Sequence, residues 1–104
     1  MATLLILYGH PEDPAAFERY YTERHLPWAS QTLPGVQDAV VRRISTTADG
    51  TPAPYYRSAE MTWADRAALD RALGSEEGRA VLADVQNFAT GGAVLMITEE
   101  DRPS

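Results

Sequence analysis

Apolar residues gather in four short runs that predict β-strands. Residues 2–9 hold an almost uninterrupted apolar stretch, which is typical of a strand buried on both faces. Residues 55–63 alternate between apolar and polar positions, as expected for a strand with one face exposed to solvent. Arg57 falls on the apolar side and therefore needs a partner or an edge position. Residues 36–45 and 93–98 predict the remaining strands, and the last is apolar on both sides.

The segments between these runs have the spacing and the caps of helices. The first helix is expected to begin at Asp13, which can accept hydrogen bonds from free N–H groups, and to end at Pro27. Residues 64–73 predict a second helix that ends at Gly74. Ser75 predicts the cap of a further helical segment. Its apolar face consists of Val81, Leu82, Val85 and Phe88.

The order of these elements, β-α-β-β-α-β, predicts an α+β, ferredoxin-like fold with a four-stranded antiparallel sheet. Pro34–Gly35 marks a turn, and residues 48–52 form a loop suited to a hairpin between antiparallel neighbours. We expect one domain over residues 1–98, followed by a charged C-terminal tail over residues 99–104.

Right-handed connections place both helical regions on the same face of this sheet. The other face would then leave an apolar patch in water, because residues 2–9 and 93–98 are apolar on both sides. A second copy of the chain can cover that patch, which predicts a homodimer with its sheets packed face to face. The alternative is a monomer whose outer sheet face is more polar than this pattern indicates.

The composition narrows the classes of partner. The 104-residue chain has a formal net charge of -6, with nine arginines and no lysine, so a nucleic-acid partner is not expected. An acidic chain without a long apolar run is also not expected to bind or cross a membrane. The chain has no cysteine. We therefore expect a cytoplasmic protein with a small hydrophobic ligand.

The first predicted helix carries the candidate chemistry. Phe17, Tyr21 and His25 are spaced four residues apart and share one helix face. An imidazole titrates near neutral pH, so His25 is the candidate for proton transfer, and Tyr21 for holding a substrate oxygen. The alternative is structural: His25 bonds a backbone carbonyl at the helix end, and the tyrosine belongs to the core.

Asp84 is the candidate partner of His25, where a carboxylate would fix the imidazole tautomer; a solvated helix residue is the alternative. Tyr20 cannot share the face of its neighbour Tyr21 and is expected to pack on the sheet. Several large or ring-bearing side chains could bind the substrate or could simply belong to the core. These candidates are Phe17, Tyr20, Trp28, Trp63, Phe88 and His10. Phe17, Trp28, Trp63 and Phe88 could form the walls of an aromatic slot. His10 and His25 lack a matched carboxylate at ligand spacing, so no metal site is expected.

Several of these positions together resemble the EthD family of the dimeric α/β-barrel superfamily. The resemblance is fairly specific where a Tyr-Tyr-x-x-x-His-x-Pro run combines with later Ser-x-x-Gly and Asp-x-x-x-Phe runs. The matching residues are Asp13, Phe17, Tyr20, Tyr21, His25, Pro27, Pro34, Gly35, Tyr56, Arg57, Ala59, Glu60, Ser75, Glu76, Gly78, Asp84, Asn87, Phe88 and Ala89. His10 and Trp28 depart from the family's usual residues, which bears on the shape of the pocket.

The resemblance implies a dimeric α/β barrel with a ligand between the helices and the sheet of each subunit. It also implies a cofactor-free enzyme of the oxygenase, isomerase, cyclase or decarboxylase type. Such an enzyme would act by proton transfer on a small hydrophobic oxygenated compound, aromatic, quinone-like or a lactone, in catabolism or secondary metabolism. The alternatives are a non-catalytic binding or accessory protein of a degradation pathway and, third, a haem-binding protein with His25 as ligand.

Overall fold

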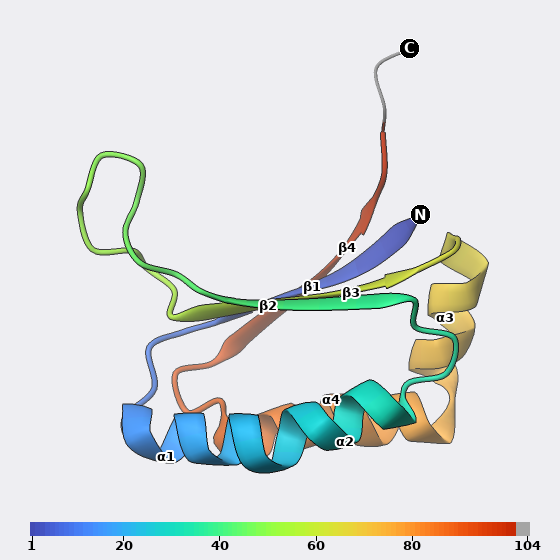
Figure 1. The fold of residues 1–104 in the computed structure, drawn as a ribbon, viewed down its shortest axis with the longest axis horizontal. Helices are drawn as coiled ribbons and strands as arrows, with labels where there is room; N and C mark the ends of the chain where they lie inside the picture. Colours follow the sequence, from blue (N-terminus) through green and yellow to red (C-terminus); the bar gives the residue numbers. More distant parts are fainter. Residues whose placement is uncertain (102–104) are drawn as a thin grey trace.

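The computed structural model describes residues 1–101 and consists of a four-stranded sheet with its helices on one face (Figure 1). All three strand pairs are antiparallel, and the order across the sheet is β2-β3-β1-β4. The strands are β1 (Ala2–Tyr8), β2 (Asp38–Arg43), β3 (Arg57–Trp63) and β4 (Ala93–Glu99). The helical elements are α1 (Pro14–Tyr20), η1 (Tyr21–His25), α2 (Leu26–Thr32), α3 (Arg66–Gly74) and α4 (Glu76–Phe88). The predicted α+β, ferredoxin-like fold is confirmed.

The strand ends differ from the expected bounds. β2 and β3 are shorter than expected because residues 44–56 leave the sheet as a loop, which begins with a hydrogen bond of 3.0 Å from the N–H of Ile44 to the carbonyl of Tyr56. At the other end of the chain, Glu99 pairs with Ala2 and belongs to β4 instead of the expected tail. Residues 102–104 of that tail lie outside the described residues.

The expectation that Pro27 ends the first helix is wrong. α1, η1 and α2 form one continuous helix beneath the sheet (Figure 1). η1 is a π-helical segment in which the N–H of Leu26 donates to the carbonyl of Tyr21, five residues back. The wider turn accommodates a residue that has no N–H and would clash with an α-helical carbonyl. Pro27 therefore lies in the first turn of α2, where no donor is required.

The helix ends instead at the predicted turn. Leu33 has the extended conformation that a following proline favours, with φ −69° and ψ 117°. Pro34 and Gly35 then reverse the chain toward β2, and Gly35 has φ 71°, a value that residues with a Cβ rarely adopt. This turn fixes where the C-terminal half of the long helix lies against the sheet.

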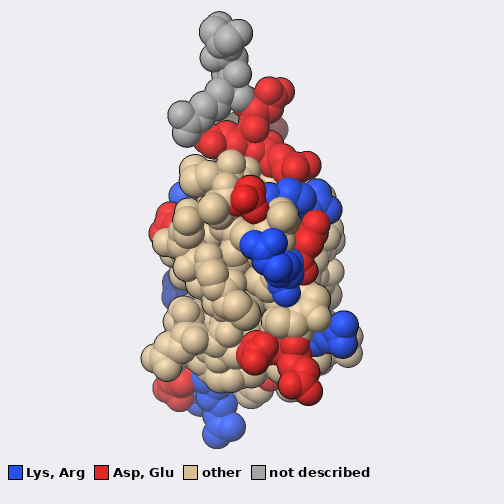
Figure 2. Space-filling model, turned by 90° about the vertical axis from the view of Figure 1, so that its right-hand side faces the viewer, with Lys and Arg blue, Asp and Glu red and all other residues tan. Residues whose placement is uncertain are grey.

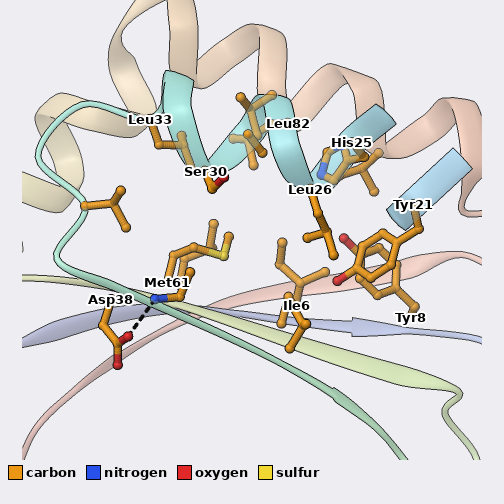
Figure 3. A pocket seen from close by; sticks show the side chains of 18 of the residues that line it. Ile6, Tyr8, Tyr21, His25, Leu26, Ser30, Leu33, Asp38, Met61 and Leu82 are labelled. Carbon is orange, nitrogen blue, oxygen red and sulfur yellow. Dashed lines mark hydrogen bonds between the residues drawn. The ribbon is translucent and has the colours of Figure 1, made fainter. Parts of the chain in front are cut away.

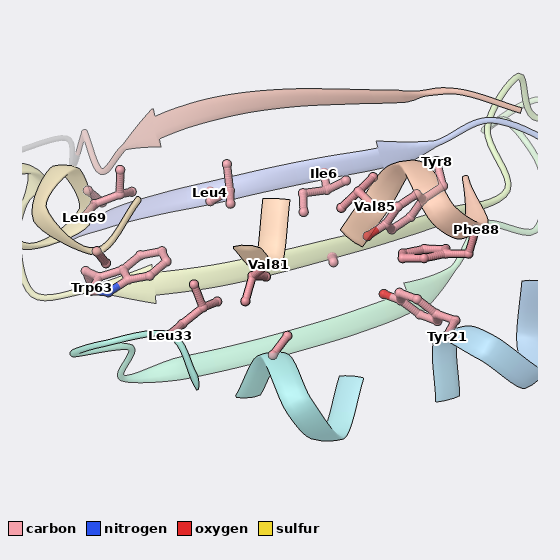
Figure 4. Close-up of a cluster of buried hydrophobic side chains, with 14 of the residues drawn as sticks. Leu4, Ile6, Tyr8, Tyr21, Leu33, Trp63, Leu69, Val81, Val85 and Phe88 are labelled. Carbon is pink, nitrogen blue, oxygen red and sulfur yellow. The ribbon is translucent and has the colours of Figure 1, made fainter. Parts of the chain in front are cut away.

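The core fills the space between the helices and the sheet (Figure 4). The inner face of β1 contributes Leu4, Ile6 and Tyr8, each at most 3% exposed. At one end of the layer, Trp63 packs near Leu69, and its indole N–H donates to the carbonyl of Pro34 at 2.8 Å. At the other end Tyr8, Phe17, Tyr21 and Phe88 form an aromatic cluster with ring centroids 5.2–5.5 Å apart.

The outer face of the sheet has no helix over it (Figure 1). The strand register places Leu5 and Leu7 of β1 beside Met96 and Val94 of β4 on this face. Met96 is 42% exposed and Val94 is 40% exposed. Both side chains lie on the one edge strand that is apolar on its two sides, so the outer face carries an apolar strip along β1 and β4.

Charged side chains of both signs are interspersed on the face shown in Figure 2, and acidic ones gather where the described chain ends. Two of them are tied back to the domain: Glu99 to Arg66 at 3.5 Å, and Glu100 to the N-terminal amine at 3.9 Å. Among residues 1–101, none of the helices is both long enough and apolar enough to span a bilayer.

We predict that Trp63 is a main determinant of stability at its end of the core. Trp63→Ala should cost about 3–5 kcal/mol in the free energy of unfolding, because it empties a fully buried site. Trp63→Phe should cost less, about 1–3 kcal/mol, through poorer filling and the loss of the hydrogen bond to Pro34. Urea unfolding at fixed protein concentration measures both. Trp28→Ala, at a 39% exposed site, is the control; equal losses at the two tryptophans would refute the assignment.

Candidate functional site

A pocket of about 290 Å³ lies between the inner face of the sheet and the helices η1, α2 and α4 (Figure 3). Most of its wall is aliphatic: Leu4, Ile6, Leu26, Val41, Val81 and Val85 are among the lining residues. Polar side chains lie at its ends. This volume is at the lower limit of those typical of small-molecule sites, and a mostly apolar wall with few polar groups is the usual composition of such sites.

The two ends of the pocket differ in exposure. Tyr21 and Tyr8, at one end, are 0% and 1% exposed. Ser30, Gln37 and Asp38, which also line the pocket, are exposed residues. The pocket therefore opens between α2 and the start of β2 and closes at the tyrosines. The carboxylate of Asp38 accepts a hydrogen bond from the N–H of Ala39 and points away from the cavity (Figure 3).

His25 lines this pocket and is 4% exposed. Its Nδ1 lies 2.7 Å from Oδ2 of Asp84, so the hydrogen bond considered from the sequence is present. A carboxylate beside Nδ1 favours the neutral tautomer with the proton on that atom. Nε2 makes no hydrogen bond to the described residues and keeps a lone pair that can accept a proton.

Asp84 is held by two further donors. The hydroxyl of Tyr20 donates to its Oδ1 at 2.6 Å, and the side-chain amide of Asn87 donates at 2.9 Å. Burial alone would raise the pKa of Asp84, but the hydrogen bonds from Tyr20, His25 and Asn87 outweigh it and lower that pKa. The carboxylate is therefore ionised and fixed in orientation beside the imidazole.

The hydroxyl of Tyr21 is buried and makes no hydrogen bond of good geometry within the described residues. The Tyr8 hydroxyl is a polar neighbour that acts to lower the pKa of Tyr21, and both hydroxyls point toward the cavity (Figure 3). Burial raises the pKa of Tyr21 to about 12. Burial and the neighbouring Tyr21 raise the pKa of Tyr8 well above its ordinary value. Both phenols therefore stay protonated, and an unpaired buried donor of this kind is costly unless a ligand or water satisfies it.

Behind Tyr21, a partly buried ion pair joins α1 to β3. Arg57 donates to Glu18 through Nε at 2.8 Å and through Nη2 at 2.6 Å. Glu18 also accepts hydrogen bonds from the Tyr56 hydroxyl at 3.0 Å and from Arg43 at 3.1 Å. The hydrogen bond from Arg57 is the main cause that lowers the pKa of Glu18 to about 2. Arg57 thus has the partner that its place on an apolar face requires.

The pocket in the structure is not the aromatic slot that the sequence led us to expect. Of the candidate residues, only His25 and Tyr21 line the pocket. Trp63 is a core residue bonded to Pro34, and Trp28 is 39% exposed with its ring 6.3 Å from His25. Helical spacing shows which residues share a face, but the wall opposite that face comes from strands, whose inward residues are aliphatic here.

Three other candidates border a separate hollow of about 230 Å³ on the outer side of the helices. Phe17, Tyr20 and Phe88 line it, and the Phe88 ring also packs 4.7 Å from His25. Tyr20 packs against Phe88 of α4, not on the sheet as expected, because its hydroxyl bonds Asp84. His10 is exposed, and its Nε2 lies 2.8 Å from the carbonyl of Ala53.

Tyr8 and the Glu18–Arg57 pair were not among the sequence candidates. Tyr8 had a signal, because it continues the inward series of Leu4 and Ile6. Glu18 had no such signal. It lies four residues before Thr22 on the predicted helix, at a position that looks exposed, and nothing there indicates an arginine on a distant strand. Within residues 1–101, no three histidine or acidic side chains come together as metal ligands.

Comparison with known proteins gives a family and related structures. Residues 9–92 match the family model described as the EthD domain. An uncharacterised 11.0 kDa protein of Rhodococcus erythropolis, from the thcB–thcC intergenic region, is 36% identical over 101 residues, which cover 97% of this chain and 96% of that protein. The crystal structure of an EthD family protein from Bacillus halodurans is also 36% identical, covers 97% of this chain and 99% of its own, and has a TM-score of 0.87.

More distant structures share the fold alone. SnoaB from Streptomyces nogalater, described as a cofactor-independent oxygenase, is 17% identical with a TM-score of 0.63 and covers 98% of this chain and 93% of its own. A dimeric ferredoxin-like protein of unknown function from Thermobifida fusca is 14% identical with a TM-score of 0.66 and covers 93% of this chain and 88% of its own.

We predict that the Glu18 ion pair makes stability depend on acid pH. A folded-state pKa of about 2, below the ordinary 4.5, means that the stabilisation is complete above about pH 4.5 and is lost as the pH falls toward 2. Its size should be on the order of 2 kcal/mol, allowing for partial solvent screening. Urea unfolding of wild type and Glu18→Gln between pH 2 and 7 should give curves that converge in acid. Glu23→Gln, at an exposed position of the same helix, should show the same pH dependence of the unfolding free energy as wild type. A difference in unfolding free energy between wild type and Glu18→Gln that stays constant with pH would contradict the assignment.

Proposed function

The chain belongs to the EthD family, and from that premise we propose that it is a cofactor-independent enzyme that moves a proton on a small hydrophobic oxygenated compound. One observation carries the proposal. The closed end of an apolar pocket holds an unpartnered phenol, Tyr21, and an imidazole, His25, whose Nδ1 is already occupied by Asp84. A pocket built only for packing would not leave a buried phenol hydroxyl without a well-formed hydrogen bond.

In the proposed reaction, Nε2 of His25 accepts a proton from a C–H or O–H group of the ligand. Asp84 holds the imidazole in the tautomer with Nδ1 protonated and stabilises the imidazolium that forms. Tyr21 donates a hydrogen bond to the ligand oxygen, and Tyr8 lies within the same end of the pocket. The aliphatic walls take up the remaining carbon frame and exclude water.

A non-catalytic binding protein is the second candidate. The wall of the pocket is mostly aliphatic, so it could hold a hydrophobic ligand without changing it. The two candidates share the pocket and differ only in whether His25 exchanges a proton with the ligand.

We predict that the protein catalyses exchange of carbon-bound hydrogen with solvent deuterium in small cyclic ketones, lactones and dihydroxybenzenes. Proton NMR in D₂O measures the loss of the C–H signal. His25→Ala should lower the exchange rate by about 100-fold or more, as expected when a general base is removed. His10→Ala is the matched control, because His10 does not line the pocket, and it should exchange like wild type. Wild-type rates equal to buffer across the panel would favour the binding protein, and full activity of His25→Ala would refute the mechanism.

We also infer that two copies of the chain pack through their outer sheet faces. The apolar strip along β1 and β4 supports this, since a monomer rarely leaves such a face in water. The likeness in fold to a protein described as dimeric agrees with it. At roughly 25 cal/mol per Å² of apolar surface, covering a sheet face contributes many kcal/mol before the costs of association are subtracted.

Sedimentation velocity at micromolar concentration should therefore give a dimer. Met96→Glu places a charge in the centre of the strip, opposite Leu5, and should shift the protein to a monomer while the inner core stays intact. Ala15→Glu, at an exposed position of α1 on the helix side, should remain a dimer. A wild-type monomer, or a Met96→Glu variant that associates like wild type, would refute this interface.

A further inference from the structure

Arg57 is a buried charge beside the pocket that the proposed proton transfer does not use. It lies on the inner face of β3, opposite Tyr8 in the register, and is 8% exposed. The two hydrogen bonds that its guanidinium donates to Glu18 hold it in one orientation. An apolar pair of similar volume is often as stabilising as such an ion pair, so the stabilisation that the pair contributes does not by itself explain a charge at this position.

The orientation that Glu18 imposes places the guanidinium over the face of the Tyr21 ring. Cζ of Arg57 lies 5.2 Å from the ring centroid. The Tyr21 ring also stacks on His25, with centroids 6.0 Å apart and an angle of 14° between the planes. A cation over a phenol face attracts ring electrons and makes the hydroxyl a stronger hydrogen-bond donor. Burial raises the pKa of Tyr21, Arg57 acts in the opposite direction, and the Glu18 carboxylate offsets part of the effect of Arg57.

The hydroxyl that this cation acts on is the one that faces the cavity without a partner. A phenol donor beside a cation in an apolar pocket favours an acceptor with negative charge, because a charge-assisted hydrogen bond is stronger than a neutral one where water is excluded. A neutral carbonyl or ether oxygen would gain much less from the same arrangement.

We infer that Arg57 is a positioning residue for Tyr21, and that the closed end of the pocket recognises ligands whose oxygen becomes an oxyanion, namely phenols and enolisable carbonyl compounds. This inference rests on the proposed proton transfer. The ligand O–H or C–H bond breaks, its proton goes to Nε2 of His25, and its electron pair remains on the ligand as phenolate or enolate. The Tyr21 hydroxyl then donates to that oxygen, and no oxidant, reductant or further reactant is consumed.

The test uses three phenols of increasing acidity: 4-methylphenol, 4-chlorophenol and 4-nitrophenol. Their dissociation constants are measured by calorimetry at one pH with the 104-residue chain. The absorbance of bound 4-nitrophenol reports whether the ligand is the anion. Wild type should bind more tightly as the phenol becomes more acidic, and it should hold 4-nitrophenol as the anion. Tyr21→Phe should bind the three phenols with nearly equal affinity.

The double variant Arg57→Met with Glu18→Gln removes both charges, so that no unpaired ion remains in the core. Its affinity for 4-methylphenol should stay within about twofold of wild type. Its preference for 4-nitrophenol over 4-methylphenol should fall about tenfold. Arg57→Lys, which keeps the charge, should retain part of the preference. Arg66→Met, an exposed arginine on α3, is the control and should match wild type. Circular dichroism checks that each variant is folded.

The outcomes separate this inference from the proposed function. If the double variant keeps the full preference for 4-nitrophenol, or loses affinity for all three phenols equally, Arg57 is structural and the inference fails while the proton-transfer proposal stands. If wild type binds the three phenols equally and leaves 4-nitrophenol neutral, the pocket does not recognise oxyanions. If none of the phenols binds, the pocket assignment that underlies the proposed function fails as well.

Discussion

A charge buried in a protein needs a partner, and two such pairs hold the long helix of this fold against its neighbours. Glu18 binds Arg57 of β3, and His25 binds Asp84 of α4. Tyr21 lies between these two attachments, stacked on His25 and covered by Arg57. These polar contacts therefore determine where an otherwise ordinary aromatic residue directs its hydroxyl, and the pocket forms next to it.

The one-sided arrangement of the helices gives the two faces of the sheet different roles. The inner face meets the helices, which enclose the pocket between aliphatic strands and η1, α2 and α4. The outer face keeps its apolar strip along β1 and β4 for a second copy under the proposed assembly. Because the two faces of a strand alternate residue by residue, neither role constrains the side chains of the other.

The order of elements could be predicted because each strand and helix carries its own hydrophobic period. The site was predictable only in part. Spacing placed Tyr21 and His25 on one face, and the Asp84 contact was a hypothesis from the way carboxylates orient imidazoles. The course of the chain at Pro27, in contrast, depended on a π turn that no local rule for proline indicates. Arg57 was recognisable as a residue in need of a partner. Its partner Glu18 was not, because that pairing depends on how the long helix crosses the sheet. The aliphatic wall was missed since it belongs to strands distant in sequence.

The central claim is that Tyr21 and His25 leave a hydrogen-bond donor and an acceptor free for a ligand oxygen inside the apolar pocket. A crystal structure of the protein with bound 4-chlorophenol tests it most directly, because the chlorine locates the ring unambiguously. The account predicts the phenol oxygen within hydrogen-bond distance of the Tyr21 hydroxyl and of Nε2 of His25, with the chlorine among the aliphatic side chains toward the mouth. A phenol in the outer hollow beside Phe17 and Phe88, or a pocket closed by its own side chains, would contradict it.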